Sequence, residues 1–309
     1  MIIEALISPS FFSIKVPEAF QVADTYVLPP PSTIAGAFAY SYAIWKNIDF
    51  QEALRVFADF SNWYFVKPLS EIMISSIILR RVRILQAAYG AVDIKKEVKK
   101  LSEIQPNAVE VLDKAGLLRK KAPRRSELLR VLRDAGLDYY YSYYEEKMFD
   151  ALFRRYAFTP KLYIASFLPN LNERFPLSFT RLGDTESYVT VNRVEYIEDF
   201  ETIDEKEAEL DSYAVLSYRD KKILTLISGD VFIQKMTMHT FLLNRRSLRE
   251  NLAVIVQPLK KLIKKVHGKN VEVYVPSKYK VKINGNCKII SFKSRILGDK
   301  IKTVVPSLR

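Results

Sequence analysis

The sequence predicts an α+β fold, in which strands and helices occupy separate stretches of the chain. Alternating apolar residues near the start, such as Ile3, Ala5 and Ile7, indicate a strand with one buried side. Apolar residues in the middle of the chain recur at helical spacing, and the last part is rich in Ile, Val and turn residues. With 309 residues, the chain can bury a large core in one domain or in two smaller ones.

Three prolines precede the first predicted helix. Residues 28–37 read Leu-Pro-Pro-Pro-Ser-Thr-Ile-Ala-Gly-Ala. Because proline holds the backbone extended, we expect the helix to begin at Ser32 or Thr33, whose hydroxyl would cap its first turn, and to end near Trp45. Gly36 and the alanines beside it make this helix thin, so that a sheet or a phosphate group can approach it closely.

Further elements surround this helix. Residues 1–16 are expected to form a strand pair interrupted at Pro9, residues 50–60 a second helix, and residues 63–66 and 72–85 extended segments. A strand, a helix and two strands in this order begin a ferredoxin-like split βαβ unit. Three arginines end the last of these segments and would project basic groups from it: Arg80, Arg81 and Arg83.

The middle of the chain is predicted to be a helical insertion over residues 93–153. Residues 111–117 and 131–137 both end in Ala-Gly-Leu, which is typical of a helix that stops with glycine at C′ and a leucine folded back on it. Similarity this short indicates shared capping chemistry rather than an internal repeat.

The chain after the insertion is expected to be rich in strands. Residues 155–168 resemble strands, and residues 213–217 and 223–227 flank a polar turn, which predicts a hairpin. A capping-box pattern at Ser247–Glu250 predicts a helix through Val266, kinked at Pro258.

The C-terminal region holds the strongest hairpin signal, because Asn284-Gly285 separates the apolar runs 279–283 and 288–292. We therefore expect three parts: an RRM-like domain of residues 1–92 and 154–240, the insertion of residues 93–153, and a C-terminal helix and β-hairpin region of residues 241–309.

Charge is the strongest global signal. The formal net charge is +13 and the sequence pI is about 9.5, although Glu195–Asp211 contains nine acidic residues and one lysine. A basic surface gains binding energy from the counterions that a polyanion releases, so nucleic acid is the leading partner class, ahead of an acidic membrane or an acidic protein. The alternative is a lysine-rich protein whose charge only keeps it soluble. Abundant Lys, Ile and Tyr with scarce Cys and His are typical of a thermophile.

The expected location is the cytoplasm. No window approaches eighteen uninterrupted apolar residues, and no basic leader precedes the first apolar residues. The single cysteine, Cys287, excludes a disulfide within the chain and a cysteine-based metal cluster, which fits a reducing compartment.

Signs of catalysis are few. The two histidines, His239 and His267, belong to no metal-spaced pair, and the sequence has no Walker motif, dinucleotide fingerprint or zinc pattern. We therefore predict no enzyme activity, no cofactor and no metal site. His239 is either a packed histidine or an acid or base for RNA cleavage, and His267 suits the last turn of the predicted helix.

Several stretches have the composition of nucleic-acid contacts. Residues 119–125 hold five bases without an acid, so this loop either clamps phosphates or is simply solvated: Arg119, Lys120, Lys121, Arg124 and Arg125. Tyrosines over residues 139–144 could stack on unpaired bases or pack internally. Lysines 260, 261, 264 and 265 would lie on the polar side of the predicted helix, where solvation or RNA explains them equally well.

Residues 179–191 contain one further motif. Gly183 follows an extended segment and is flanked by Arg181, Leu182, Asp184 and Thr185. This arrangement predicts a tight turn whose backbone can approach a ligand, followed by a strand.

Residues 28–37 and 181–187 together resemble the fifth family of CRISPR-associated proteins, most closely its archaeal subtype I-A branch. The resemblance covers residues 1–45 and 175–191 and otherwise extends only to architecture. It implies a ferredoxin-like (RRM-like) domain of the RAMP superfamily, a helical insertion or thumb, and a smaller β-rich C-terminal part.

The resemblance also implies a function. Such a subunit would grip the 5′ handle of CRISPR RNA, without catalysis, in a type I (Cascade-like) interference complex, beside a backbone subunit and a large subunit. It would meet target DNA only through that complex and would contact no membrane. Two alternatives remain, a metal-independent endoribonuclease that processes precursor CRISPR RNA and the related RAMP subunit of a type III complex. The matching motifs assign handle contacts to Ser32, Thr33, Gly36 and the turn from Arg181 to Thr185.

Overall fold

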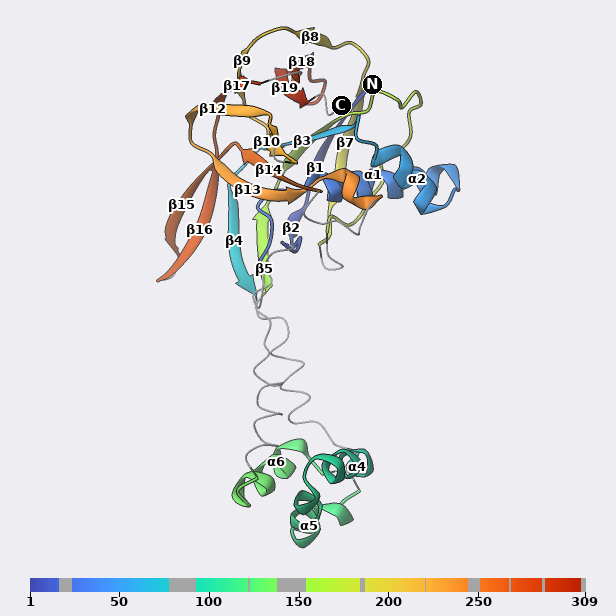
Figure 1. Cartoon of the computed structure of the whole chain (residues 1–309), viewed down its shortest axis with the longest axis vertical. Coiled ribbons are helices and arrows are strands. Elements are labelled where there is room, and N and C mark those ends of the chain that lie inside the picture. Colours follow the sequence, from blue (N-terminus) through green and yellow to red (C-terminus); the bar gives the residue numbers. More distant parts are fainter. Residues whose placement is uncertain are drawn as a thin grey trace. The chain divides into compact units, whose positions relative to one another are not determined.

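The computed structural model describes residues 1–16, 24–77, 93–121, 123–137, 154–183, 187–219, 221–243, 251–266, 268–284 and 287–306. The chain divides into two compact units (Figure 1). One unit comprises Met1–Ser76 and Arg155–Arg309, and the other comprises Ile77–Arg154. The α+β class is confirmed, since helices and antiparallel sheets occupy separate stretches of the chain.

The first unit is built on a four-stranded sheet with the order β3-β6-β1-β7. These strands are β1 (Ile2–Ser8), β3 (Trp63–Pro68), β6 (Leu162–Phe167) and β7 (Thr190–Ile197). Strand β6 lies between β1 and β3 and is antiparallel to both, so β1 and β3 run in the same direction. The predicted strand, helix, strand order is therefore confirmed for this part of the chain.

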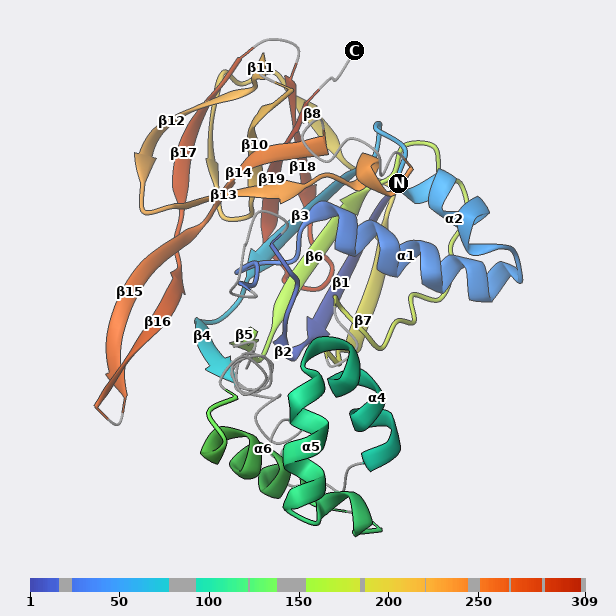
Figure 2. The ribbon, with the colours of Figure 1, turned by 60° about the horizontal axis from the view of Figure 1, so that its bottom comes forward.

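Helices α1 (Pro31–Lys46) and α2 (Phe50–Phe57) connect β1 to β3, and Figure 2 shows α1 crossing the strands of this sheet. The predicted helix is confirmed, and its buried side presents Ile34, Phe38 and Tyr42 at helical spacing. The link from β6 to β7 has no helix in residues 168–183. Its Phe175 packs 5.3 Å from Tyr42 between ring centroids, so irregular chain covers the helix there.

The remaining strands form four further sheets. A five-stranded sheet has the order β15-β16-β4-β5-β2, and smaller sheets have the orders β11-β10-β14-β13, β12-β17-β9 and β19-β18-β8. Their bounds are β2 (Ser10–Phe12), β4 (Ile72–Ile77), β5 (Arg154–Thr159), β8 (Glu201–Ile203), β9 (Glu207–Leu210), β10 (Ala214–Tyr218), β11 (Lys221–Lys222), β12 (Leu224–Gly229), β13 (Phe232–Thr237), β14 (Leu252–Gln257), β15 (Leu259–Val266), β16 (Lys269–Pro276), β17 (Tyr279–Ile283), β18 (Cys287–Lys293) and β19 (Lys300–Pro306).

The helix predicted over residues 247–266 is wrong. Strands β14 and β15 occupy residues 252–257 and 259–266, with Ile255 opposite Gln234 and Ile263 opposite Glu272. The apolar run Val254-Ile255-Val256 favours a strand, and partner strands are present on both sides of β14. The lysines of residues 260–265 therefore lie on an edge strand, where such residues discourage pairing with other chains.

Both predicted hairpins also differ from the structure. Strands β17 and β18 flank Asn284-Gly285 but do not pair, because β17 lies between β12 and β9 while β18 lies between β19 and β8. The hairpin predicted at residues 213–227 is reduced to two pairs between β10 and β11, Ser217 with Lys222 and Tyr218 with Lys221. Strand β12 pairs elsewhere, with β17.

The second unit is helical over the described residues 93–137, which are part of the insertion predicted over residues 93–153. It contains α4 (Ile94–Ile104), α5 (Pro106–Lys114), the short 3₁₀ helix η1 (Leu117–Arg119) and α6 (Arg125–Asp134). Gly116 and Gly136 follow α5 and α6 with φ of 70° and 71°, as the capping pattern predicted. Its separate core consists of leucines and one alanine: Leu101, Ala108, Leu112, Leu117, Leu128, Leu129 and Leu132. Residues 138–153 lie outside the described part.

Candidate nucleic-acid interface

The two sequence motifs meet at one cavity of about 750 Å³ in the first unit. Ser32, Thr33 and Gly36 of α1 line it together with Arg181 and Gly183, which lie almost 150 residues further along the chain. The other lining residues are Lys15, Ala37, Tyr40, Phe179, Thr180, Thr237, Phe241 and Leu242. Strand β13 and the short 3₁₀ helix η2 (His239–Leu242) therefore supply a third wall.

The first turn of α1 is fixed differently from the prediction. Pro30 is the N-cap, Pro31 begins the helix, and no side chain caps it, so the expected hydroxyl cap is wrong. The Ser32 hydroxyl instead hydrogen-bonds the Thr237 hydroxyl at 2.6 Å between oxygens, and Ser32 is only 8% exposed. Thr33 is the more open of the two predicted residues, since its side chain is half-buried on the cavity wall.

The predicted tight turn is present. Arg181 bridges to Tyr188, and the Leu182 N–H donates to the Ser187 carbonyl at 3.0 Å. Gly183 has a φ of 103°, and a Cβ there would stand 2.4 Å from Ile14 Cγ1. The turn can lie this close to residues 13–14 only because position 183 has no side chain.

Leu182 is fully buried in the hydrophobic core, so its side chain anchors the turn rather than facing a ligand. Ser187, at the other end of the turn, accepts the Ser13 N–H at 2.9 Å through its hydroxyl. Asp184 and Thr185 lie outside the described residues.

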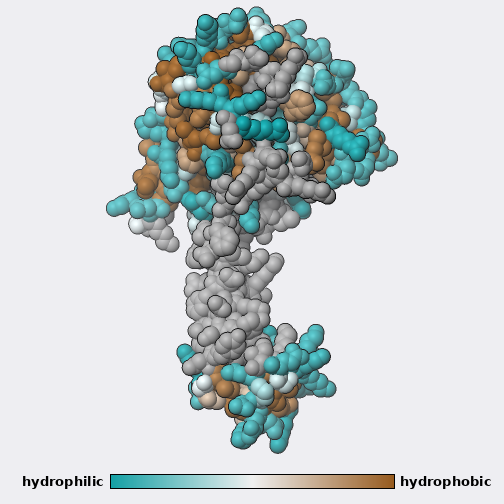
Figure 3. Space-filling view, viewed as in Figure 1, coloured by the Kyte–Doolittle hydropathy of each residue, from teal (hydrophilic) through white to brown (hydrophobic). Residues whose placement is uncertain are grey.

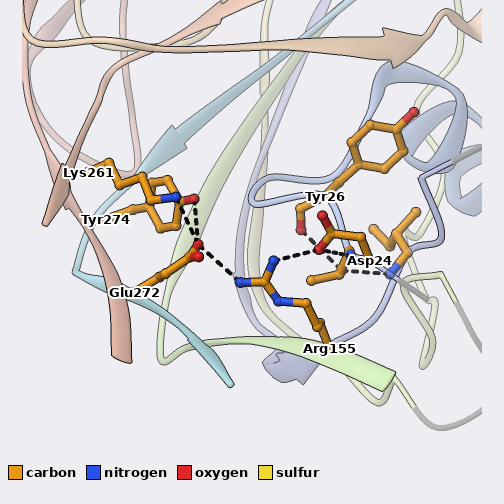
Figure 4. Close-up of polar contacts among 8 residues, drawn as sticks. Asp24, Tyr26, Arg155, Lys261, Glu272 and Tyr274 are labelled. Atoms are coloured by element: carbon orange, nitrogen blue, oxygen red, sulfur yellow. Dashed lines mark hydrogen bonds and ion pairs between the residues drawn. The ribbon is translucent and has the colours of Figure 1, made fainter. Parts of the chain in front are cut away.

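An ion-pair network holds the segment that carries Lys15. Arg155 bridges Asp24 at 3.1 Å and Glu272 at 3.0 Å, and Lys261 and Tyr274 also contact Glu272 (Figure 4). Burial opposes ionisation of Glu272, but Lys261 and Arg155 outweigh it and lower the pKa of this carboxyl.

The backbone beside Asp24 continues this support. The Val16 N–H donates to the Asp24 carbonyl, and Lys15 bridges to Thr25, so the Arg155 network steadies the cavity wall at Lys15.

The cavity is basic and aromatic. Lys15 and Arg181 are exposed, and the Arg181 guanidinium lies 5.7 Å from the centroid of the Tyr188 ring. No acidic side chain is among the described residues that line the cavity, and Tyr40, half of whose surface is exposed, offers a ring on the same wall. This combination suits a ligand with negative charge and flat aromatic groups.

The acidic run of residues 195–211 is engaged elsewhere. Glu201 pairs with Lys300, Glu205 with Lys302, Glu209 with Lys278, and Asp211 with Lys67. These four carboxylates pair with lysines that do not line the cavity, so they do not neutralise Lys15 or Arg181.

His239 lies close to the cavity wall but is fully buried, between the rings of Trp63 and Tyr64 at centroid distances of 5.9 and 5.3 Å. Burial lowers its pKa to about 4, while the main chain of Asp59 opposes the shift. The residue is neutral at pH 7 and out of reach of a phosphate, so it is a packed histidine.

The other predicted contacts do not join this cavity. Arg119, Lys120, Lys121, Arg124 and Arg125 belong to the second unit, where Arg125 pairs with the buried Glu97 at 3.5 Å. On β15, Lys260 pairs with Asp230 and Lys264 with Glu71. Arg80, Arg81, Arg83, the tyrosines of residues 139–144 and His267 lie outside the described part of the chain.

Sequence reasoning missed eight lining residues: Lys15, Ala37, Tyr40, Phe179, Thr180, Thr237, Phe241 and Leu242. Tyr40 could have been found, because it follows Thr33 and Gly36 by seven and four residues on one side of a helix. No local pattern brings residues 237–242 to α1, since this contact depends on the packing of β13 and η2 against a helix far away in the sequence.

The fold of this chain is similar to that of a solved structure. The structure matches the crystal structure of a CRISPR protein from Archaeoglobus fulgidus with a TM-score of 0.51 and 13% identity, covering 99% of this chain and 100% of that one. A mannose 6-phosphate isomerase structure is too dissimilar to inform the fold. Its TM-score is 0.13 and its identity 13%, and the match covers 83% of this chain and 75% of that one. No protein family model matches the sequence, and no curated protein matches it.

Two further observations concern the described residues alone. None of their helices is long and apolar enough to cross a membrane, and none of their His, Cys, Asp and Glu side chains form a group of three that could hold a metal ion.

Proposed function

We propose that this chain binds the 5′ handle of CRISPR RNA as a non-catalytic backbone subunit of a type I interference complex of the Cascade-like subtype I-A, in antiviral defence. The observation that carries the proposal is the joint lining of one basic, aromatic cavity by Ser32, Thr33 and Gly36 with Arg181 and Gly183. The fold shared with a CRISPR protein from Archaeoglobus fulgidus supports it.

The cavity residues would divide the work of RNA binding. Arg181 and Lys15 would neutralise phosphates, because both are exposed and cationic on adjoining walls. Tyr40 and Tyr188 are 50% and 59% exposed and would stack on unpaired bases. Gly183 would let the RNA backbone approach the main chain of the turn.

The architecture fits this role. The order β3-β6-β1-β7, with α1 and α2 between β1 and β3, supports a ferredoxin-like RAMP domain, although the link after β6 has no helix in residues 168–183. The helical unit would be the thumb. Neighbouring backbone and large subunits would be the protein partners, target DNA would be met only through the complex, and the complex would act in the cytoplasm of an archaeal thermophile.

The endoribonuclease alternative loses its main candidate residue. A general acid or base must reach the proton that it transfers, and His239 is enclosed by Trp63 and Tyr64. Incubation of the protein with repeat RNA without metal should therefore leave the RNA intact, and defined cleavage would favour the processing enzyme.

A charge-matched pair of variants tests the cavity. Lys15→Ala with Arg181→Ala should weaken binding of handle RNA about tenfold or more and lower its salt slope by about 1.4, since two cations leave a single-strand site. Lys278→Ala with Lys302→Ala removes the same charge from residues paired with Glu209 and Glu205 and should change little. Equal losses in both variants would overturn the cavity as the site.

The subtype is tested separately by assembly. Mixing the protein with type I or with type III backbone subunits and handle RNA should give a stable complex with the type I subunits. A complex with type III subunits alone would identify it as the related RAMP subunit.

A further inference from the structure

The helical unit of residues 93–137 concentrates positive charge at one end. The first turns of helix α4 contain Lys95, Lys96 and Lys99, all exposed. The segment before α6 contains Lys121 and Arg124, which are also exposed. These stretches are about twenty-five residues apart in the sequence, so no local pattern joins them.

A buried ion pair brings them together. Arg125, the first residue of α6, contacts Glu97 in the first turn of α4 at 3.5 Å, and Glu97 is 6% exposed. The start of α4 therefore adjoins the start of α6. The lysines that flank Glu97 and the bases that precede Arg125 must lie at this same end of the unit.

Three described acidic residues of the unit form ion pairs, and a fourth caps a helix. Glu97 is matched by Arg125, Glu127 by Lys120 at 3.2 Å, and Glu110 by Lys114 on α5. Asp93 caps α4 by accepting the Lys96 N–H. The described residues of the unit have a mainly hydrophilic surface in Figure 3, and those at this end include more basic than acidic side chains.

The composition of this surface limits its ligand. Residues 93–137 contain no Phe, Tyr, Trp or His, so they offer no ring on which an unpaired base could stack. The cavity in the first unit, by contrast, has Tyr40 on its wall. A basic surface whose described residues offer no aromatic ring is suited to the regular phosphates of a duplex, whose bases are already stacked on one another.

We propose that the basic end of this helical unit is a second nucleic-acid site, which binds the sugar–phosphate backbone of a duplex without reading its sequence. Its contacts are Lys95, Lys96, Lys99, Arg119, Lys121 and Arg124, with Arg125 and Glu97 fixing their arrangement. The site is separate from the cavity and does not depend on the function proposed for it.

The test uses the full chain with Lys95, Lys99, Lys121 and Arg124 all changed to alanine, titrated with a short mixed-sequence DNA duplex, an RNA duplex and a single-stranded RNA. Affinity for both duplexes should fall about tenfold or more, and the salt slope should fall by up to about 3.6, while the affinity for single-stranded RNA falls less. A fall in affinity for only one of the duplexes would still support the site and would show which kind of duplex it binds.

Two control proteins complete the design. Changing Lys260, Lys278, Lys300 and Lys302 to alanine removes equal charge from ion-paired residues and should leave duplex binding nearly unchanged. Exchanging Lys for Arg and Arg for Lys at the four tested positions keeps the charge and should retain duplex binding, which separates loss of contacts from misfolding. Unchanged duplex affinity in the alanine variant, or an equal fall in duplex and single-strand affinity, would overturn the proposal.

Discussion

The hydroxyl oxygens of Ser32 and Thr237 lie 2.6 Å apart, in a buried contact between residues 205 positions apart in the sequence. The contact joins the first turn of α1 to the end of β13 at the edge of the cavity. It fixes the proline-led helix start against the wall that η2 continues. The geometry of the candidate site therefore depends on the C-terminal half of the chain.

Removing one partner of this hydrogen bond should cost more than removing both. Ser32→Ala leaves the buried Thr237 hydroxyl without its partner and should lower the free energy of unfolding by about 1–3 kcal/mol. Thr237→Val in the same chain should restore part of that loss. Denaturant unfolding of the two single variants and the double variant measures the coupling, and strictly additive losses would contradict it.

Gly183 should tolerate no side chain. The Cβ of an alanine at this position would stand 2.4 Å from Ile14 Cγ1, and the residue would have to adopt a φ of 103°. The turn must therefore move away from residues 13–14. Gly183→Ala should lower the free energy of unfolding by about 1–3 kcal/mol and weaken handle RNA binding. Gly298→Ala, at a φ of 80° with open space around it, is the control and should leave RNA binding unchanged. Equal RNA affinity in both variants would contradict the role of the turn.

His239 should make stability depend on pH. Burial depresses its pKa from 6.5 to about 4, so between these values the unfolded chain binds a proton that the folded chain does not. The contribution of His239 to the free energy of unfolding is complete above pH 6.5. As the pH falls from 6.5 toward 4, the free energy of unfolding decreases by up to about 3 kcal/mol because of this residue. Unfolding at pH 7 and pH 4.5 should show a smaller fall for His239→Phe than for the unchanged protein. Equal falls would exclude a buried neutral histidine.

Glu4 should anchor the C-terminal turn to the central sheet. Its carboxylate is fully buried on β1 and accepts the Arg295 and Ile296 N–H groups and the Ser294 and Tyr163 hydroxyls. Glu4→Gln removes an acceptor from these hydroxyls and should lower the free energy of unfolding by about 2 kcal/mol. The exposed Glu209→Gln should change it by less than about 0.5 kcal/mol. Similar values for both variants would contradict this role.

The first helix and the helical unit could be predicted because their signals are local. The prolines before Ser32, the helical spacing of Ile34 and Phe38, and the Gly116 and Gly136 caps all act within a few residues. The turn at Gly183 was predictable for the same reason. No spacing of residues predicts that this turn lies beside α1. Only the resemblance to a known family, which contains both motifs, suggested that the two are close.

The C-terminal half could be predicted less well, because one strand has the spacing of a helix and several others pair with strands far away in the sequence. The spacing of lysines 260, 261, 264 and 265 is compatible with a helix, but β15 pairs with β16 over its full length. Asn284-Gly285 has the composition of a tight hairpin, yet β17 pairs with the earlier strands β12 and β9, and β18 pairs with β19 and with the distant β8. Thr237 and Phe241 reach the cavity because β13 and η2 pack against α1, a helix about 200 residues earlier in the sequence, so these lining residues had no sequence signal.

Handle recognition can be tested by binding of the purified protein to CRISPR repeat RNA with its 5′ handle, compared with a scrambled RNA across a salt series. We expect tighter binding of the handle RNA at every salt concentration, with the RNA recovered intact on a gel. Equal and steeply salt-dependent affinity for both RNAs would contradict handle recognition, because charge alone would then explain the binding.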